Sequence, residues 1–303
     1  MQLNLRGIIP PMVTPLTADK NLDQQSLKGL IEHLLSGGVH GIFLLGSNGE
    51  APSLTYALRK ELVTEACQII NGRVPVLVGI TDTSFEGSIE MAEHAQASGA
   101  DAVVIAPPYY FPISDGEMEA YLEDLVPKLP LPFLLYNMPS CTKMNLSMNT
   151  VEKAKNMGAL GIKDSSGNLE YLYNLIETFQ DSPEFAIIVG TEGFLPQAIE
   201  RGGHGAVAGG ANFFPRMFVD LYDASVTKDE NKIVEIREKV THLYDTIYNV
   251  GKDFSRITKG IKCALSIMGI CDDYMALPLR RFDAGDRERI KTYIEVFEKQ
   301  GIR

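Results

Sequence analysis

The sequence predicts an α/β protein built as a (β/α)8 TIM barrel with a C-terminal helical extension. Short apolar segments alternate with segments of helical spacing, and the apolar segments have no polar face, as in a parallel sheet covered by helices. Eight such units fit into about 220 residues, which is typical of a closed barrel. A doubly wound open sheet is the alternative. It usually has fewer strands and a nucleotide-binding turn, and the sequence contains no GxGxxG motif and no P-loop motif.

Glycine separates helix from strand at four places in this pattern. Gly38, Gly99, Gly158 and Gly202 each follow a helical segment and precede an apolar one. A glycine at such a point fits a helix C-cap, which needs a left-handed residue. Four more apolar segments alternate with helical segments in the same way. The eight predicted strands cover residues 7–14, 39–45, 75–80, 102–106, 132–136, 159–162, 185–189 and 206–208.

The segments between the strands carry helical spacing. Apolar residues recur every three or four positions over residues 27–36 and again from Leu58 to Ile70. After about residue 223 the strands stop, and only amphipathic helices are expected. These last helices cover residues 232–248, 257–268 and 287–298. We therefore expect a barrel over residues 1–223 and a helical extension over residues 224–303 that packs on the barrel.

The composition limits the classes of function. Lys and Arg number 28 against 39 Asp and Glu, a net charge of -11, whereas a nucleic-acid-binding or anionic-membrane surface needs a basic face. No apolar run is long enough to span a membrane, and the first residues lack the pattern of a signal peptide. The four cysteines are scattered and form no CxxC motif. These features predict a cytoplasmic protein with reduced thiols and no nucleic-acid or membrane partner.

Lys163 is the first candidate catalytic residue because it stands where the short apolar strand 159–162 ends. Burial of an amine disfavours its charged form and lowers its pKa. A neutral amine is a nucleophile toward a carbonyl carbon, so Lys163 is a candidate Schiff-base former. The alternative is an ordinary lysine that leaves the strand and pairs with Asp164 or another carboxylate.

The strand ends carry polar residues that a barrel would bring to one mouth. Residues 46–49 (Gly-Ser-Asn-Gly) follow the second strand and offer main-chain N–H groups to an anion, although an ordinary tight turn is the alternative. Tyr136 ends the fifth strand, and taken alone such a tyrosine is more often a core aromatic residue with its hydroxyl satisfied. A carboxylate next to an electrophilic carbon, within reach of a lysine, describes a 2-oxo acid.

Four motifs occur in order with barrel spacing. They are Gly46-Ser47-Asn48-Gly49-Glu50, Pro108-Tyr109-Tyr110, Tyr136-Asn137-Met138-Pro139 and Gly161-Ile162-Lys163-Asp164. With them the chain resembles the dihydrodipicolinate synthase / N-acetylneuraminate lyase superfamily of class I, pyruvate-dependent aldolases. The resemblance covers essentially the whole chain, including the helical extension. The four motifs together are highly specific.

The resemblance implies four catalytic residues. Lys163 would form the Schiff base, and Tyr136 above it would move protons as general acid and base. Ser47 would link Tyr136 by a hydrogen bond to Tyr110. In the family that second tyrosine comes from a neighbouring subunit, which implies a homo-oligomer, either a tight dimer or a dimer of dimers (a homotetramer).

The resemblance also implies how the substrate is held. Main-chain N–H groups in the turn of Gly46, Ser47 and Asn48 would bind the substrate carboxylate, and Val207 would lie against the pyruvyl group through its backbone. The partners would be a small 2-oxo acid and an aldehyde. The covalent Schiff base through Lys163 would serve without a metal or another cofactor, and the sequence shows none of the usual metal-ligand spacings.

Departures from the pattern separate the possible reactions. In the family's synthases an arginine binds the carboxylate of the aldehyde substrate, and this chain has Cys141 at that position. The synthases also usually have two threonines at the positions of Ser47 and Asn48. The strand-eight run of residues 208–212 is closer to sugar-acid aldolases. The first hypothesis is therefore a lyase that cleaves or forms a 2-oxo-3-deoxy sugar acid or a related hydroxy-oxo-acid. The alternatives are 4-hydroxy-tetrahydrodipicolinate synthase, a 2-oxo sugar-acid dehydratase, and a barrel that binds a 2-oxo acid without turnover.

Overall fold

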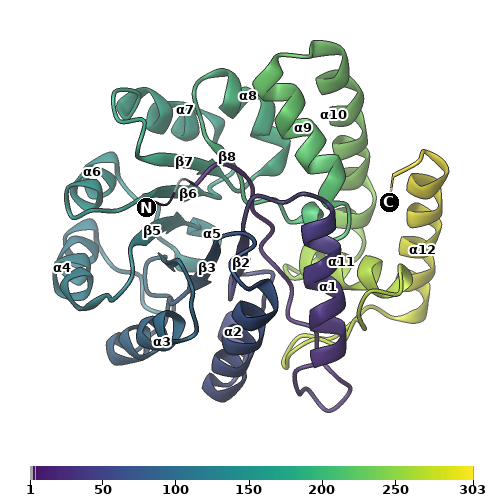
Figure 1. Ribbon diagram of the computed structural model, residues 1–303, viewed down its shortest axis with the longest axis horizontal. Helices are drawn as coiled ribbons and strands as arrows, with labels where there is room; N and C mark the ends of the chain where they lie inside the picture. The colour runs from purple at the N-terminus through teal and green to yellow at the C-terminus, as the bar shows by residue number, and fades with distance from the viewer. Residues whose placement is uncertain (1–2, 4, 303) are drawn as a thin grey trace.

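Eight parallel strands form one sheet in the order β1-β8-β7-β6-β5-β4-β3-β2 in a computed structural model that describes residue 3 and residues 5–302 (Figure 1). The strands are β1 (Gly7–Ile8), β2 (Ile42–Leu44), β3 (Val76–Gly79), β4 (Ala102–Ile105), β5 (Phe133–Asn137), β6 (Gly161–Asp164), β7 (Ala186–Val189) and β8 (Gly205–Ala206). A parallel bridge between Pro11 and Phe43 joins the β1 edge to the β2 edge. The predicted (β/α)8 barrel is thereby confirmed.

The strand boundaries differ most from the prediction at the first strand. Residues 7–14 were expected to be extended, but β1 is two residues long. Pro10 and Pro11 follow after Ile9, and proline cannot donate to a ladder. The carbonyl oxygen of a proline can still accept a hydrogen bond, and Phe43 N donates to Pro10 O at 3.0 Å. The barrel is thus closed between β1 and β2 by separate hydrogen bonds instead of a continuous ladder.

Helices surround the strands on the outside of the barrel (Figure 1). Those that follow β1 to β4 are α1 (Gln24–Ser36), α2 (Tyr56–Ile70), α3 (Phe85–Ala97) and α4 (Asp115–Leu125). Those that follow β5 to β8 are the short α5 (Pro139–Thr142) with α6 (Met148–Asn156), then α7 (Leu169–Thr178), α8 (Leu195–Glu200) and α9 (Pro215–Thr227). Side-chain N-caps begin α1, α2, α3, α4, α6 and α7. The four predicted cap glycines all have positive φ.

Two glycines let neighbouring strands approach closely. A Cβ atom on Gly161 would lie 2.0 Å from Ala186 O, and one on Gly205 would lie 2.1 Å from Gly7 O. Only glycine fits such contacts. Gly161 therefore sets the start of β6, two residues before Lys163.

The apolar residues form two cores. One lies between the strands and the surrounding helices. The other fills the barrel interior and includes Phe43, Tyr136, Ile188 and Val207. Tyr136 and Val207, both expected at the site, therefore belong to the interior layer.

The C-terminal part is helical, as predicted, with α10 (Glu230–Asp245), α11 (Arg256–Ile267) and α12 (Ala284–Lys299). Ile233, Ile236 and Val240 are buried on one face of α10, which packs on α9. Helix α9 runs across residue 223, and the division of the chain at that point stays a prediction. None of the described helices combines the length and apolar character that crossing a membrane requires.

Candidate active site

The candidate catalytic residues lie at the carboxyl ends of adjacent strands. Tyr136 is the next-to-last residue of β5 and Lys163 the next-to-last of β6, and their Cα atoms are paired in the sheet register. Paired residues of parallel strands point to the same face. Because Tyr136 is part of the interior core, both side chains project into the barrel.

The Lys163 amine is enclosed by aromatic rings. The residue is 4% exposed, and its Nζ lies 3.8 Å from the centroid of the Tyr136 ring and 4.9 Å from that of Phe43. Burial lowers the pKa of Lys163 below that of an ordinary lysine, and Tyr136 opposes part of this effect. Such an amine is more readily neutral, as a nucleophile must be.

Asp164 is not the partner of Lys163. Its carboxylate accepts hydrogen bonds from Asn137 Nδ2 at 2.9 Å and from the main chain and hydroxyl of Ser166 at 3.1 and 3.0 Å. Successive residues of a strand point to opposite faces, so Asp164 is directed away from the interior. Within the described residues, Lys163 forms no ion pair with any carboxylate. The ordinary ion-pair interpretation of Lys163 is therefore wrong.

Ser47 lies against the phenol of Tyr136. The two hydroxyl oxygens are 3.2 Å apart, and either can donate. The structure thus brings together three of the four predicted catalytic side chains. The fourth, Tyr110, does not approach this group within one chain: its residue is 81% exposed and its ring stacks edge-on with Phe111 at 5.1 Å.

The turn of residues 46–49 offers free donors. For the N–H groups of Ser47 and Asn48, the described part of the chain supplies no acceptor. The turn itself is fixed from two sides, because Thr14 Oγ1 donates to Gly49 O at 2.7 Å and Thr258 Oγ1 donates to Asn48 Oδ1 at 3.1 Å. Rigid, unpaired N–H groups at a turn suit a carboxylate. Gly46, beside them, is buried.

Val207 lies just beyond β8. It is 2% exposed, and its N–H donates to Val189 O at 2.9 Å. It therefore lies at the carboxyl end of the barrel, and its expected contact with a pyruvyl group stays a prediction.

One buried acid at the mouth was missed by the sequence reasoning. Glu192, which follows β7, accepts hydrogen bonds from the Tyr248 hydroxyl at 2.8 Å and from Gly210 N at 3.1 Å. Burial raises the pKa of Glu192 to about 7, and these donors limit the rise. The sequence feature that could have identified Glu192 is its position as an acidic residue soon after the predicted strand 185–189.

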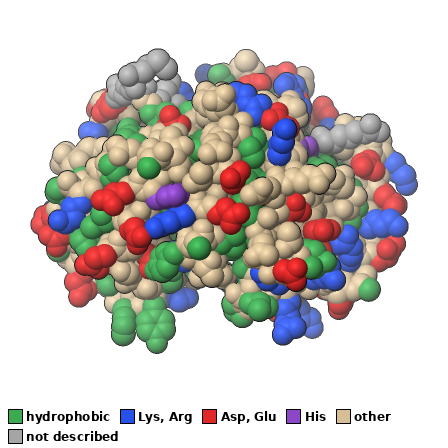
Figure 2. Space-filling model, turned by 60° about the horizontal axis from the view of Figure 1, so that its bottom comes forward, with side chains coloured by type: hydrophobic (Ala, Val, Ile, Leu, Met, Phe, Trp, Pro, Cys, Tyr) green, Lys and Arg blue, Asp and Glu red, His purple; other side chains and the backbone are tan. Residues whose placement is uncertain are grey.

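The turn after β5 carries Cys141 and Lys143. Cys141 lies on α5, and burial raises the pKa of its thiol. Lys143, two residues on, donates from Nζ to Ser140 O at 3.0 Å and so folds back on its own turn. Figure 2 shows acidic and basic side chains interspersed over one face of the molecule.

The fold and the comparisons define the class of protein as a class I aldolase, a carbon–carbon lyase. The chain belongs to the Dihydrodipicolinate synthetase family, whose model matches residues 4–296. The resemblance inferred from the four motifs is thereby confirmed.

Relatives of different reactions resemble the chain over almost its whole length. It is 46% identical to a dihydrodipicolinate synthase structure from Bacteroides thetaiotaomicron (TM-score 0.94, 98% of this chain and 100% of the other). It is 30% identical to YagE, a prophage protein from Escherichia coli K12 solved in complex with pyruvate (TM-score 0.91, 99% of each chain). It is 31% identical to the probable 2-dehydro-3-deoxy-D-pentonate aldolase YjhH of Escherichia coli K12, over 98% of this chain and 97% of the relative.

Proposed function

We propose that the protein is a Schiff-base lyase that cleaves or forms a 2-oxo-3-deoxy sugar acid or a related hydroxy-oxo-acid, with pyruvate or another 2-oxo acid as one reactant. The observation that carries the proposal is the Lys163 amine, buried under the Tyr136 ring with its pKa lowered by burial and with no carboxylate partner in the described structure. Such an amine is a carbonyl nucleophile.

The reaction follows from that amine. Neutral Lys163 attacks the C2 carbonyl to give a carbinolamine, which loses water to give an iminium. The iminium accepts the electron pair of the C3–C4 bond as the aldehyde leaves, or that of a C3–H bond as the proton leaves, and an enamine results. In the opposite direction the enamine adds to an aldehyde. Water then releases the product and regenerates the amine, so no external cofactor is required.

The surrounding groups have separate roles in this proposal. Tyr136 transfers the protons at the carbinolamine, and Ser47, 3.2 Å from its hydroxyl, relays them. The N–H groups of Ser47 and Asn48, with Gly46 in the same turn, bind the carboxylate. The backbone of Val207 bounds the pyruvyl group.

The sugar-acid substrate is favoured by the turn after β5. The arginine that binds a second carboxylate in the synthases is replaced by Cys141, and Lys143 donates to its own turn at 3.0 Å. A sugar aldehyde carries hydroxyl groups and needs no such cation. Two relatives, YjhH and YagE, are named as a probable and a putative sugar-acid aldolase.

Dihydrodipicolinate synthase is the second candidate. It is supported by the 46% identity to the structure described as that enzyme from Bacteroides thetaiotaomicron. The two candidates differ in the aldehyde that they accept. Condensation of pyruvate with aspartate semialdehyde supports the synthase, whereas release of pyruvate from 2-oxo-3-deoxy sugar acids supports the first candidate. Loss of water from a sugar acid without release of pyruvate identifies a dehydratase.

A second copy of this chain is the proposed macromolecular partner. Tyr110 and Phe111 are 81% and 74% exposed, and a T-shaped pair of aromatic rings so exposed suits a protein interface. In the proposed dimer Tyr110 completes the relay of the neighbouring subunit, and two dimers form a homotetramer. All four cysteines are free, which agrees with the proposed cytoplasmic location.

Trapping of the covalent intermediate tests the proposal. The protein is incubated with pyruvate, reduced with borohydride and analysed by mass spectrometry of the whole chain and its peptides. A pyruvate-derived adduct on the Lys163 peptide is expected, with none in Lys163→Ala and an unchanged yield in the matched control Lys143→Ala. A folded protein that yields no adduct with pyruvate or longer 2-oxo acids, yet binds them, would be a binding barrel without turnover.

A further inference from the structure

The strands that carry Tyr136 and Lys163 end one residue after them. Asn137 is the last residue of β5 and Asp164 the last of β6, and the sheet register pairs these two directly beside the catalytic pair. Successive side chains of a strand point to opposite faces, so Asn137 and Asp164 lie behind the catalytic pair, away from the barrel interior. The placement of the catalytic phenol relative to the amine therefore depends on what joins the two strands at their ends.

A hydrogen bond between side chains joins these strand ends. Asn137 Nδ2 donates to Asp164 Oδ1 at 2.9 Å, and the two residues are 0% and 2% exposed. Asp164 also accepts from the main chain of Ser166 at 3.1 Å and from its hydroxyl at 3.0 Å. The main chain adds a contact, since Ser165 N donates to Asn137 O at 2.8 Å. Together these bonds fix β5 against β6 at the level of the catalytic pair.

The rest of the Asn137 amide is bonded to the segment that follows α5. Its Nδ2 also donates to Asn145 Oδ1 at 2.9 Å, and its Oδ1 accepts from Leu146 N at 3.0 Å. Leu146 is held in turn by Tyr171 of α7, whose hydroxyl donates to Leu146 O at 2.7 Å. A buried polar network in which the groups are paired is rigid. Asn137 is thus fixed from α7 as well as by its own strand.

We propose that Asn137 and Asp164 are positioning residues for catalysis: their hydrogen bond holds the ends of β5 and β6 so that the catalytic phenol and amine keep the mutual placement that proton transfer requires. The inference rests on the proposed function, because it assumes that Lys163 forms the Schiff base and that Tyr136 moves its protons. Asn137 and Asp164 point away from the interior and do not touch the substrate. Their effect on the reaction passes through their neighbours in the two strands.

The rate of proton exchange in pyruvate tests the proposal. In deuterium oxide, reversible enamine formation replaces the C3 protons of pyruvate, and NMR follows the exchange. Asp164→Ala removes the acceptor and is expected to slow exchange about tenfold, a part of the roughly 100-fold that a misplacement of about 1 Å can cost. Asp164→Asn keeps an oxygen for Asn137, and its amide can donate to the Ser166 hydroxyl. This variant should stay within about twofold of the parent rate, because a hydroxyl accepts as well as donates.

A double-mutant cycle shows whether the effect passes through the catalytic pair. In the Tyr136→Phe background the hydroxyl to be aligned with Lys163 is already absent, so Asp164→Ala should cost less than about twofold. A general loss of folded protein would instead slow both backgrounds by the same factor. Thermal unfolding verifies that each variant is folded at the assay temperature. Equal losses in the two backgrounds, an Asp164→Ala variant of full activity, or an Asp164→Asn variant as slow as Asp164→Ala would each overturn the positioning role.

Two tyrosines of the outer helices provide a matched pair of variants. Tyr171→Phe removes the hydroxyl that holds Leu146 and should slow exchange about threefold, since the loss of one hydrogen bond only partly releases Asn137. Tyr121 of α4 likewise uses its hydroxyl for one hydrogen bond, to Ser88 Oγ at 3.3 Å.

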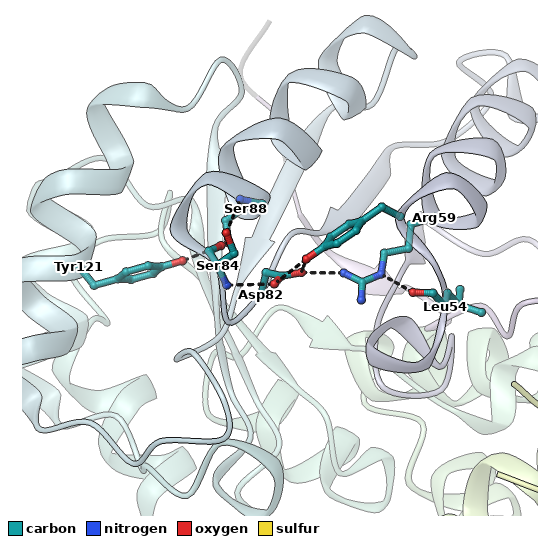
Figure 3. Close-up of polar contacts among 8 residues, drawn as sticks. Leu54, Arg59, Asp82, Ser84, Ser88 and Tyr121 are labelled. Carbon is teal, nitrogen blue, oxygen red and sulfur yellow. Dashed lines mark hydrogen bonds and ion pairs between the residues drawn. The ribbon is translucent and has the colours of Figure 1, made fainter. Parts of the chain in front are cut away.

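The Tyr121 bond belongs to a separate part of the barrel. Figure 3 shows it between α4 and α3, near the ion pair in which Arg59 Nη1 donates to Asp82 Oδ2 at 2.9 Å. Tyr121→Phe should therefore leave the exchange rate unchanged. If Asp164→Ala does not fold, Tyr171→Phe takes its place in the cycle, and equal rates in Tyr171→Phe and Tyr121→Phe would then overturn the proposal.

The outcome for the proposed function is distinguishable. A parent protein that exchanges pyruvate protons and forms the Lys163 adduct keeps the proposed function, whatever the variants of Asp164 and Tyr171 show. A parent protein that does neither removes the function and the positioning role together.

Discussion

Lys262 Nζ and Glu50 Oε1 lie 2.6 Å apart, and neither side chain has any exposed surface. Glu50 belongs to the turn that ends β2, and Lys262 lies on α11. Lys262 also donates to Tyr274 O, and Ala276 N donates to the second oxygen of Glu50. The pair therefore anchors the helical extension to the turn that carries Ser47 and Asn48.

Breaking this pair should destabilise the protein. Lys262→Met leaves the Glu50 charge buried and unpaired, which typically costs about 3–5 kcal/mol. Urea denaturation is expected to show that loss, and the double variant Lys262→Met with Glu50→Gln should recover part of it. The matched control is Lys239→Met, which removes an i,i+4 surface pair with Glu235 and should change stability by less than about 0.5 kcal/mol. Equal losses of stability in Lys262→Met and Lys239→Met would contradict the role of the buried pair as an anchor of the helical extension.

The rate of adduct formation should report the lowered pKa of Lys163. Burial lowers this pKa, so the neutral amine forms at lower pH than in an ordinary lysine. The rate of borohydride-trapped adduct formation with pyruvate should rise with pH and level off below about pH 10, near which an unperturbed lysine titrates. A rate that continues to rise through that value would show an amine in an ordinary environment.

Glu192 should make stability fall as the pH rises. Its pKa in the folded protein is raised to about 7, above the unfolded value near 4.5, so its proton is bound more tightly in the folded state. Stability from this group is present at low pH and is lost as the pH rises through 7. Relative to the parent protein, Glu192→Gln should gain about 3 kcal/mol between pH 4.5 and 8, since one pKa unit corresponds to about 1.4 kcal/mol. Denaturation curves at several pH values measure this, and a constant difference would refute it.

Mixing two inactive variants should restore activity if Tyr110 acts across subunits. A Tyr110→Phe chain keeps Lys163, and a Lys163→Ala partner supplies Tyr110 to it. Random exchange makes about half of the dimers mixed, and one of the two sites in each mixed dimer is complete. About a quarter of all sites, and hence of the parent activity, is therefore expected. Mass spectrometry of the intact assembly verifies the exchange. Verified mixed dimers without activity would place Tyr110 outside the neighbouring site.

Features set by local sequence were predictable. The alternation of apolar and helical segments predicted the barrel, and glycine marked the starts of strands. Lys163 was a candidate because it is a polar group at the end of a buried strand, whereas Tyr136 was proposed only through the family motif that it begins. The shortness of β1 reflects Pro10 and Pro11, which were visible but do not indicate how many ladder bonds remain.

Pairs between distant residues were not predictable. Glu50 and Lys262 are 212 positions apart, and each looks like a surface charge when its neighbours in the sequence are considered alone. Arg59 and Asp82 likewise belong to separate βα units, and only the packing of α2 against the β3 turn reveals their contact. Tyr110 was named through the motif Pro108-Tyr109-Tyr110. Its role in a neighbouring subunit came only from the family resemblance, because no spacing in the sequence shows which subunit a residue serves.

Phe43 combines two roles that make the chemistry depend on completed folding. Its backbone bridges to Pro11 where the barrel closes, and its ring is 4.9 Å from Lys163 Nζ. An open sheet would leave that amine in water, as an ammonium ion at neutral pH. In the proposed mechanism, Lys163 therefore acquires its nucleophilic form only when the barrel has closed.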